Sequence, residues 1–142
     1  MTKLVINTDG GARGNPGPAA LGVVLGDKHY AEAIGRTTNN VAEYRAVVFA
    51  LKKAKQLLGK KKASEAEIEV RTDSELMQRQ LTGRYKIENK DLQPLFMEIW
   101  NLRLDFKKVD FIHVPRAQNS DADKLVNEAL DAAEVNLLNI RT

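Results

Sequence analysis

The chain has 142 residues, which favours a single domain over residues 1–142, and its 43% hydrophobic and 29% charged residues are typical of a globular protein in water. The absence of cysteine excludes a disulfide framework, a thiolate metal site and a cysteine nucleophile, and no apolar run reaches the ~18 residues of a membrane span. The net charge of +3 is compatible with a phosphate-rich partner, and without a signal-peptide pattern we expect a cytoplasmic protein that does not bind membranes.

Hydrophobic patterns predict strands early in the chain and helices later. A β-branched, apolar run ends at Thr8, just before Asp9 and a loop rich in glycine and proline. Apolar residues at a spacing close to 3.6 then predict a long helix, with Asn40 as its N-cap and Gly59 beyond its end. In chain order, the predicted elements are strands at 3–8, 20–25 and 29–34, a helix at 41–58, a strand at 67–72, helices at 74–81 and 92–104, a strand at 109–114, a helix at 121–135 and a tail at 136–142 that we expect to dock.

The order of these elements predicts an α/β fold. The first three strands have short connections, as in an antiparallel meander. Helices separate the last two strands, which therefore join as parallel neighbours through crossovers. The expected architecture is a five-stranded mixed sheet with helices on both faces.

Four carboxylates lie at the ends of these elements. Asp9 and Asp73 each follow a predicted strand, and Glu43 and Asp123 each lie in the first turn of a predicted helix. If the two strands are parallel neighbours, their aspartates emerge at the same edge of the sheet. Ligand sites of such sheets lie at that edge.

Helix capping is the simpler explanation of each acid considered alone. Glu43 lies three residues after Asn40, and Asp123 lies three residues after Ser120, which is the spacing of a capping box. Asp73 can likewise cap the helix that follows it. Capping, however, does not require the four acids to lie together, as this topology allows.

Four converging carboxylates repel one another unless cations lie between them. Oxygen ligands without histidine or cysteine select Mg²⁺ or Mn²⁺ over Zn²⁺. Two such ions about 4 Å apart can activate a water and stabilise the leaving oxygen of a phosphodiester. A basic chain with an acidic metal pocket therefore indicates phosphoryl-transfer chemistry on nucleic acid.

Each of the four acids lies within a longer motif. In order, the motifs are Thr8-Asp9-Gly10-Gly11 with Gly14-Asn15-Pro16-Gly17, then Thr38-Asn39-Asn40-Val41-Ala42-Glu43, then Thr72-Asp73-Ser74, and finally Asn119-Ser120-Asp121-Ala122-Asp123-Lys124-Leu125. Together they resemble the type 1 ribonuclease H family, in the same order and over nearly the whole chain. Four ordered motifs are far more specific than any one of them.

This resemblance implies the ribonuclease H-like fold and an endoribonuclease that hydrolyses the RNA strand of RNA–DNA hybrids, leaving 3′-hydroxyl and 5′-phosphate ends. It also implies that Asp9, Glu43, Asp73 and Asp123 hold two Mg²⁺ ions, for which Mn²⁺ can substitute. Asp9 and Asp73 would be the central ligands. Glu43 would hold one ion and contact the RNA near the cut, and Asp123 would complete the site of the ion that carries the attacking water.

The resemblance also assigns contacts with the substrate. A protein distinguishes RNA from DNA through the 2′-hydroxyl, which suits amide side chains because they both donate and accept hydrogen bonds. The residues that match the family's 2′-hydroxyl contacts are Asn15, Asn39 and Asn40, with the backbone of Gly14 and Glu75. Those that match its pocket for a phosphate of the DNA strand are Arg36, Thr38 and Asn89. Loop structure and helix capping are the other explanation of Asn39 and Asn40.

The chain departs from many bacterial members in two places. Their long basic helix, rich in tryptophan, is replaced by the short connection at residues 81–92, whose three cations predict weaker or more salt-sensitive substrate binding. Their loop histidine before the last acid is missing, and Arg116 is our candidate for its cationic role. Both features are typical of the compact branch in archaea and some bacteria.

Two other functions stay open at this point. One is a nucleic-acid-binding relative with weak catalysis, against which the presence of all four acids argues. The other is a nuclease of the same fold that acts on DNA, against which the paired asparagines argue, or on double-stranded RNA, which the sequence leaves open. The expected partner is an RNA–DNA hybrid. No feature indicates an obligate protein partner, so we expect a monomer.

Overall fold

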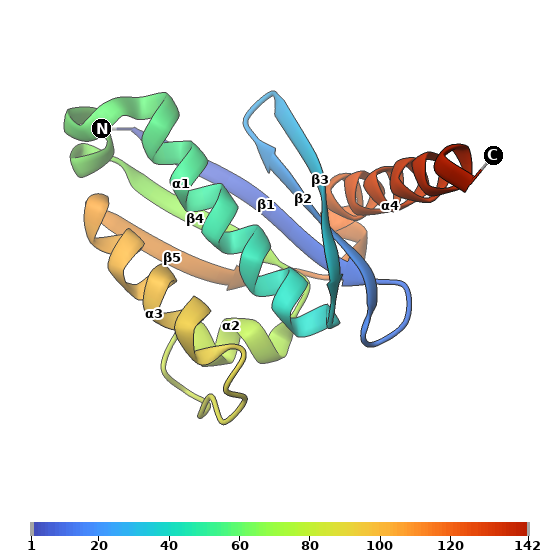
Figure 1. Ribbon diagram of the computed structural model, residues 1–142. Helices are drawn as coiled ribbons and strands as arrows, with labels where there is room; N and C mark the ends of the chain where they lie inside the picture. Colours follow the sequence, from blue (N-terminus) through green and yellow to red (C-terminus); the bar gives the residue numbers. More distant parts are fainter. Residues whose placement is uncertain (1, 142) are drawn as a thin grey trace.

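The computed structural model describes residues 2–141, which form one mixed sheet with helices on both faces (Figure 1). In chain order the elements are β1 (Lys3–Ala12), β2 (Gly17–Leu25), β3 (Lys28–Thr37), α1 (Asn39–Glu65), β4 (Glu67–Thr72), α2 (Glu75–Leu81), α3 (Gln93–Leu102), β5 (Lys108–His113) and α4 (Ser120–Arg141), with short 3₁₀ helices at Arg103–Asp105 and Arg116–Asn119. None of the helices in these residues is both long and apolar enough to cross a membrane.

The strands lie in the order β3-β2-β1-β4-β5. The first three pair antiparallel, whereas β4 pairs parallel with β1 and with β5. The predicted five-stranded mixed sheet is therefore confirmed, with β1 at its centre.

Strand β1 is longer than the sequence predicts. Its parallel ladder with β4 ends where Asn7 pairs with Arg71, but its antiparallel ladder with β2 continues as far as Ala12. Asp9 thus lies within β1, paired with Gly22, instead of following the strand. It still lies just beyond the parallel pair, at the edge of the sheet where a ligand site was expected.

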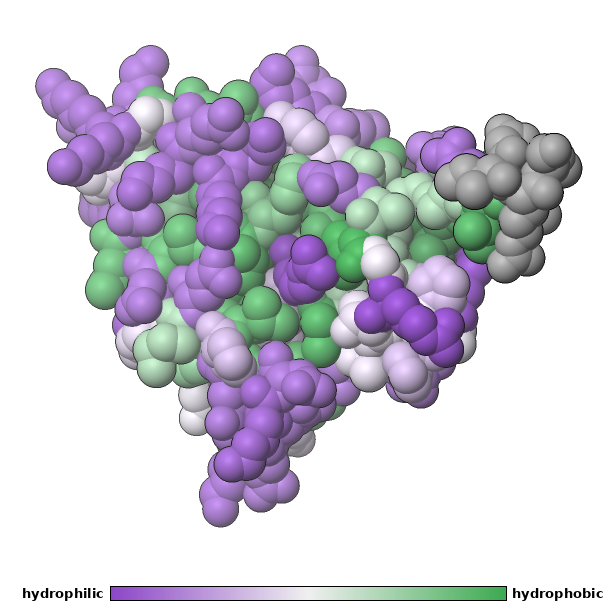
Figure 2. All heavy atoms as spheres, in the orientation of Figure 1, coloured by the Kyte–Doolittle hydropathy of each residue, from purple (hydrophilic) through white to green (hydrophobic). Residues whose placement is uncertain are grey.

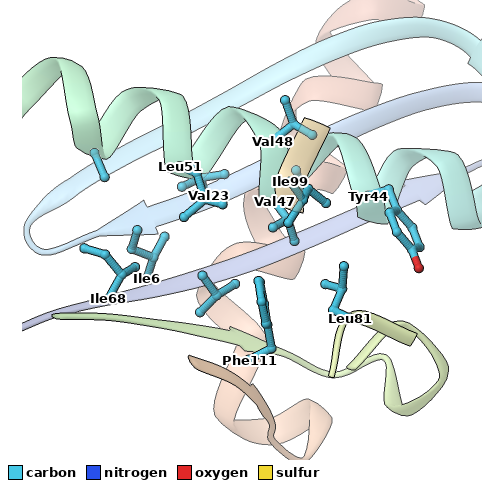
Figure 3. Close-up of a cluster of buried hydrophobic side chains, with 14 of the residues drawn as sticks. Ile6, Val23, Tyr44, Val47, Val48, Leu51, Ile68, Leu81, Ile99 and Phe111 are labelled. Atoms are coloured by element: carbon cyan, nitrogen blue, oxygen red, sulfur yellow. The ribbon is translucent and has the colours of Figure 1, made fainter. Parts of the chain in front are cut away.

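The larger core lies between the sheet and the helices α1, α2 and α3. Figure 3 shows Ile6 and Val23 of the sheet facing Val47 and Leu51 of α1, with Ile99 of α3 close by. All five are at most 1% exposed, and burying each such side chain contributes about 1.5–3 kcal/mol to folding. This packing explains the 3.6-residue spacing that identified α1.

Helix α4 covers the opposite face of the sheet. Its buried residues Val126, Ala129 and Leu130 pack with Ala20 of β2. The half of α4 nearer the C-terminus extends beyond the sheet (Figure 1). Among the described residues, the core beneath α4 is therefore much smaller than the core beneath α1.

The long helix α1 differs from its prediction at both ends. It begins at Asn39, and the Thr38 hydroxyl accepts a hydrogen bond from the Val41 N–H at 3.3 Å. Thr38 is therefore the N-cap, and the assignment of Asn40 to that role is wrong. Gly59, at φ 80°, interrupts the helix where predicted, but the chain then becomes helical again.

Helix α4 continues to Arg141 and does not end at Val135. Residues 136–141 therefore continue the helix, and the prediction of a separate tail after residue 135 is wrong. The side chains of residues 138–142 lie outside the described residues, so the docking expected for them stays a prediction.

The connection between α2 and α3 is mostly polar and lies on the surface of the protein. Nearly all of residues 82–92 are exposed, and Figure 2 shows hydrophilic residues gathered at the bottom of the view, where this connection lies in Figure 1. As the sequence predicts, the connection between these two helices is short and polar.

Candidate active site

Three of the four predicted carboxylates meet at one end of the sheet. Asp9 lies in β1, Glu43 lies in α1, and Asp73 directly follows β4. One carboxylate oxygen from each lies within 4.8 Å of the other two. Asp9 is 9% exposed and the Asp73 side chain 13%, so the group is largely withdrawn from water.

The fourth carboxylate, Asp123, shares a cavity of about 290 Å³ with these three, although it does not belong to the group within 4.8 Å. It lies in the first turn of α4 and is half-buried. Other residues that line the cavity include Gly10, Arg13, Asn39, Arg116 and Asn127.

Two glycines allow the helices that carry Glu43 and Asp123 to approach Asp9. A Cβ on Gly10 would lie 2.4 Å from the backbone nitrogen of Glu43 in α1. A Cβ on Gly22, which pairs with Asp9, would lie 2.3 Å from the backbone oxygen of Ala122 in α4. Any larger residue at either place would hold a helix away from the site.

Capping does not account for Glu43 or Asp73. Because α1 begins at Asn39, Glu43 lies in its second turn and caps nothing, and the capping-box interpretation is wrong. Helix α2 is capped by Ser74, whose hydroxyl accepts from the Met77 N–H at 3.2 Å. Both carboxylates therefore face the cavity without a structural role at a helix end.

Burial and mutual repulsion hold protons on this group. Burial, together with the charges of Asp73, Asp123 and Glu43, raises the pKa of Asp9 from 3.8 to about 8. Burial also raises the pKa of Glu43 from 4.5 to about 7, with a hydrogen bond from Ser74 opposing the shift. A site made of carboxylates that cannot all ionise together fits divalent cations with a preference for oxygen ligands.

The asparagines expected to contact RNA hold the glycine-rich loop against α1. The side-chain oxygen of Asn39 accepts from the Ala12 N–H at 2.7 Å, and that of Asn15 accepts from the Asn39 N–H at 3.0 Å. Gly14, at φ 93°, turns the chain between them. The loop is therefore ordered by the same side chains that the resemblance assigns to substrate.

The remaining predicted contacts lie outside the residues that line the cavity. Arg36 and Asn40 are exposed, Thr38 caps α1, and the Glu75 side chain pairs with Arg79. The side-chain oxygen of Asn89 accepts from the Asp91 N–H at 2.9 Å in the turn before α3.

Arg116 does lie at the cavity. Its Nε is 3.7 Å from a carboxylate oxygen of Asp73, and its side chain is 86% exposed. Exposed pairs of this kind add little to stability, so the guanidinium is free to turn toward an anion.

The family model described as Reverse transcriptase-like matches residues 7–129. The chain is 44% identical over 131 residues to a ribonuclease HI of Halobacterium salinarum, which covers 88% of this chain and 63% of that protein. The fold of this chain matches the solved structure of LC11-RNase H1, a protein isolated from compost by a metagenomic approach. The TM-score is 0.87, with 46% identity, and the match covers 94% of this chain and 99% of that one.

The chain belongs to the type 1 ribonuclease H family. LC11-RNase H1 has also been solved in complex with an RNA/DNA hybrid, and this chain matches that structure with a TM-score of 0.86 and 44% identity over 92% of this chain and 98% of that one. A bifunctional protein of Mycobacterium tuberculosis is 41% identical over 138 residues, covering 92% of this chain. The chain spans 36% of the length of that protein and 63% of the Halobacterium protein.

One buried residue that supports the site has a contact pattern that the family motifs do not reveal. Asn119 is 1% exposed, donates through Nδ2 to the Thr8 carbonyl at 2.9 Å and accepts from the Asn7 side chain at 3.2 Å. It ties the segment before α4 to β1. Its place in the last motif was visible, but its partners lie more than 100 residues away in the sequence.

Proposed function

We propose that this chain is an endoribonuclease that hydrolyses the RNA strand of RNA–DNA hybrids and leaves 3′-hydroxyl and 5′-phosphate ends. The observation that supports this most strongly is the cavity in which Asp9, Glu43, Asp73 and Asp123 face Asn39. Carboxylates for metal ions thus adjoin an amide suited to a 2′-hydroxyl. The likeness to an enzyme that has been solved with such a hybrid adds support.

Two Mg²⁺ ions, for which Mn²⁺ can substitute, are the proposed cofactors. Asp9 and Asp73 would be the central ligands, with Glu43 on one ion and Asp123 on the other. The donors fit, because all four are carboxylates and three of them already lie within 4.8 Å. When bound, the ions would lower the pKa of the attacking water and stabilise charge on the leaving oxygen.

The asparagines are proposed to select RNA. Asn39 uses its side-chain oxygen on the Ala12 N–H, so its NH₂ group is the part that would donate to a 2′-hydroxyl. Asn15 is held beside it through the Asn39 N–H. The backbone of Gly14 and Glu75 and the side chain of Asn40 would complete these contacts.

The cationic and phosphate contacts are part of the same proposal. Arg36, Thr38 and Asn89 would receive a phosphate of the DNA strand. Arg116 would hold the scissile or product phosphate, because it is an exposed cation at the edge of an acidic cavity. Action as a monomer in the cytoplasm stays a prediction.

A cleavage assay with defined substrates tests this function. The purified chain is incubated with an end-labelled RNA–DNA hybrid, single-stranded RNA, double-stranded RNA and duplex DNA, each in Mg²⁺, in Mn²⁺ and in EDTA. We expect cleavage of the RNA strand of the hybrid alone, and only with metal. Intact hybrid in both metals would refute the proposal, and cleavage of duplex DNA or double-stranded RNA in its place would indicate the other nuclease function.

A matched pair of variants on α4 tests the site. Asp123→Asn removes a carboxylate that lines the cavity, whereas Asp121→Asn removes an exposed one from the same turn. We expect a large loss of cleavage for the first and wild-type rates for the second. Equal rates for the two variants would exclude Asp123 from the site.

A further inference from the structure

Arg13 joins the glycine-rich loop after β1 to the exposed side of α4. Its Nη2 lies 2.7 Å from a carboxylate oxygen of Asp131, and its Nη1 lies 3.3 Å from one of Glu134. Nη2 also donates to Oδ1 of Asn127 at 3.5 Å. One guanidinium group therefore contacts three side chains spread over two turns of the helix.

These contacts lie on the side of α4 that carries Asp123. Asp123, Asn127, Asp131 and Glu134 are four, four and three residues apart, so they form one stripe along the helix. Asn127 donates from Nδ2 to the backbone oxygen of Asp123 at 3.1 Å. Arg13 is thus connected to the backbone of Asp123 through a single intervening side chain.

The backbone of Arg13 belongs to the loop that is proposed to bind RNA. Its N–H donates to the Pro18 carbonyl at 2.8 Å, which closes the loop around Gly14 and Asn15. Asn39 holds the same loop against α1 through the Ala12 N–H. The loop is therefore fixed to α1 by an asparagine and to α4 by Arg13.

We propose that Arg13 is a positioning residue that holds Asp123 at a fixed distance from the RNA-binding loop. This inference rests on the proposed function, because it gives Asp123 a metal ion and the loop an RNA strand. Arg13 acts through α4 and does not touch the reacting atoms. Without Arg13, α4 would shift relative to the loop, and the affinity of the site for the metal ion held by Asp123 would fall.

Helix α4 depends on such a contact more than α1 does. In the part of the chain that the structure describes, its buried cluster consists of Val126, Ala129 and Leu130 with Ala20, and its far half leaves the sheet (Figure 1). Asp123 also lies outside the group of three carboxylates within 4.8 Å. A polar contact along the helix therefore has a share in setting where Asp123 lies.

A direct contact between Arg13 and a substrate phosphate is the competing role. The carboxylates of Asp131 and Glu134 neutralise the guanidinium, which makes it a poor phosphate ligand as it lies. The two roles predict opposite effects for removing these acids: a positioning role predicts the same defect as loss of Arg13, and a phosphate role predicts tighter substrate binding.

The experiment compares Arg13→Gln, the double variant Asp131→Asn/Glu134→Gln, their combination and a control, Lys55→Gln. The control removes an exposed ion pair of 3.1 Å, between Lys55 and Asp105, that belongs to neither the loop nor α4. Two quantities are measured for each: the Mg²⁺ concentration for half-maximal cleavage at saturating hybrid, and Mg²⁺ affinity by calorimetry without hybrid.

We expect Arg13→Gln to raise both quantities about two- to fivefold, the effect expected for losing exposed ion pairs. The acid double variant should do the same, and the combination should add little, because all three residues act through one contact. Arg13→Lys should recover part of the loss, and Lys55→Gln should match the wild type.

Two results would overturn the inference. One is a wild-type Mg²⁺ dependence for Arg13→Gln. The other is a raised KM for hybrid in Arg13→Gln together with a lowered KM in the acid double variant, which indicates a phosphate contact. Calorimetry separates this inference from the proposed function: a wild type that binds Mg²⁺ but does not cut hybrid refutes the function, while the Mg²⁺ affinity of Arg13→Gln still tests the positioning.

Discussion

Replacing Gly10 with alanine should move α1 away from β1 and take Glu43 out of the carboxylate group. An ideal Cβ at Gly10 would lie 2.2 Å from the carbonyl carbon of Ala42 and 2.4 Å from the nitrogen of Glu43. Both are backbone atoms, so no side-chain rotation relieves the overlap. Since carbon atoms in contact lie about 3.5–4.0 Å apart, the start of α1 must shift by more than ~1 Å.

Two magnitudes follow from this shift. Overpacking of this kind costs about 1–3 kcal/mol, and a chain of this size loses roughly 4 °C of Tm per kcal/mol, so Tm should fall by about 4–12 °C. A displacement of about 1 Å at a reacting group lowers catalysis about 100-fold. The rate of hybrid cleavage at saturating Mg²⁺ should therefore fall far more than the folded fraction at the assay temperature.

The neighbouring glycine is the matched control. A Cβ on Gly11 would lie 3.5 Å from a side-chain carbon of Val126, which is ordinary contact. Gly11→Ala should therefore keep a wild-type Tm and cleavage rate in thermal melts and initial-rate assays. The reasoning fails if Gly10→Ala behaves like the wild type, or if Gly11→Ala is as damaging as Gly10→Ala.

Two further predictions concern the charges of the site. Asp73→Asn should lower the rate of hybrid cleavage by more than about 100-fold, because losing a metal ligand should cost more than losing a residue that only hydrogen-bonds to one. The Tm of this variant should stay level or rise, because repulsion between the carboxylates is relieved. An unchanged cleavage rate would show that Asp73 does not bind the metal ions. Without metal, the raised pKa values of Asp9 (about 8) and Glu43 (about 7) mean that the folded chain keeps protons that the unfolded chain releases near its ordinary values of 3.8 and 4.5. The contribution of these two groups to the free energy of unfolding in EDTA should therefore be greatest below about pH 4, and should fall as the pH rises through 7 and 8. Saturating Mg²⁺ should remove most of that slope in urea titrations, and a free energy that rises with pH in EDTA would contradict the cause given for the shifts.

The sequence predicts the elements well wherever one face of an element is buried. The sequence predicts β4 with the bounds it has, because its alternating pattern reflects burial of Ile68 and Val70 against one core. The end of β1 was missed because Asp9 and the residues after it read as a turn, and only the antiparallel ladder with β2 keeps them extended. The sequence of a segment indicates its local conformational preference, but not which neighbouring strand will override that preference.

The helix start at Thr38 shows a similar limit. Thr38, Asn39 and Asn40 are all residues that cap helices, and their order alone does not decide which one does. The structure assigns the cap to Thr38, because Asn39 is required elsewhere as the acceptor for the Ala12 N–H. That choice also moves Glu43 into the second turn and frees it from the capping box.

The motifs identify the four acids that line the cavity, whereas they do not identify the residues that hold the surrounding segments together. Arg13 meets Asp131 and Glu134 across more than 110 residues of chain, and Asn119 meets Thr8 across 111. Such contacts leave no periodic signal, because each partner is an ordinary polar residue in its own segment. Only the fold brings them together.

Asp9 lies between two glycines that face opposite sides of the sheet, and this arrangement sets the spacing of the carboxylates. Gly10 admits the backbone of α1 at Glu43, and Gly22 admits the backbone of α4 at Ala122, the residue before Asp123. Gly22→Ala should therefore push α4 away from the sheet and displace Asp123, just as Gly10→Ala should displace Glu43. Because Asp123 lines the cavity but lies outside the group of carboxylates within 4.8 Å, the loss should appear mainly as a raised Mg²⁺ requirement for cleavage. The opposite result is a Gly22→Ala protein that is destabilised but has an unchanged Mg²⁺ requirement. It would show that a shift of α4 does not disturb the carboxylate of Asp123, and that the packing at Gly22 does not control Mg²⁺ binding.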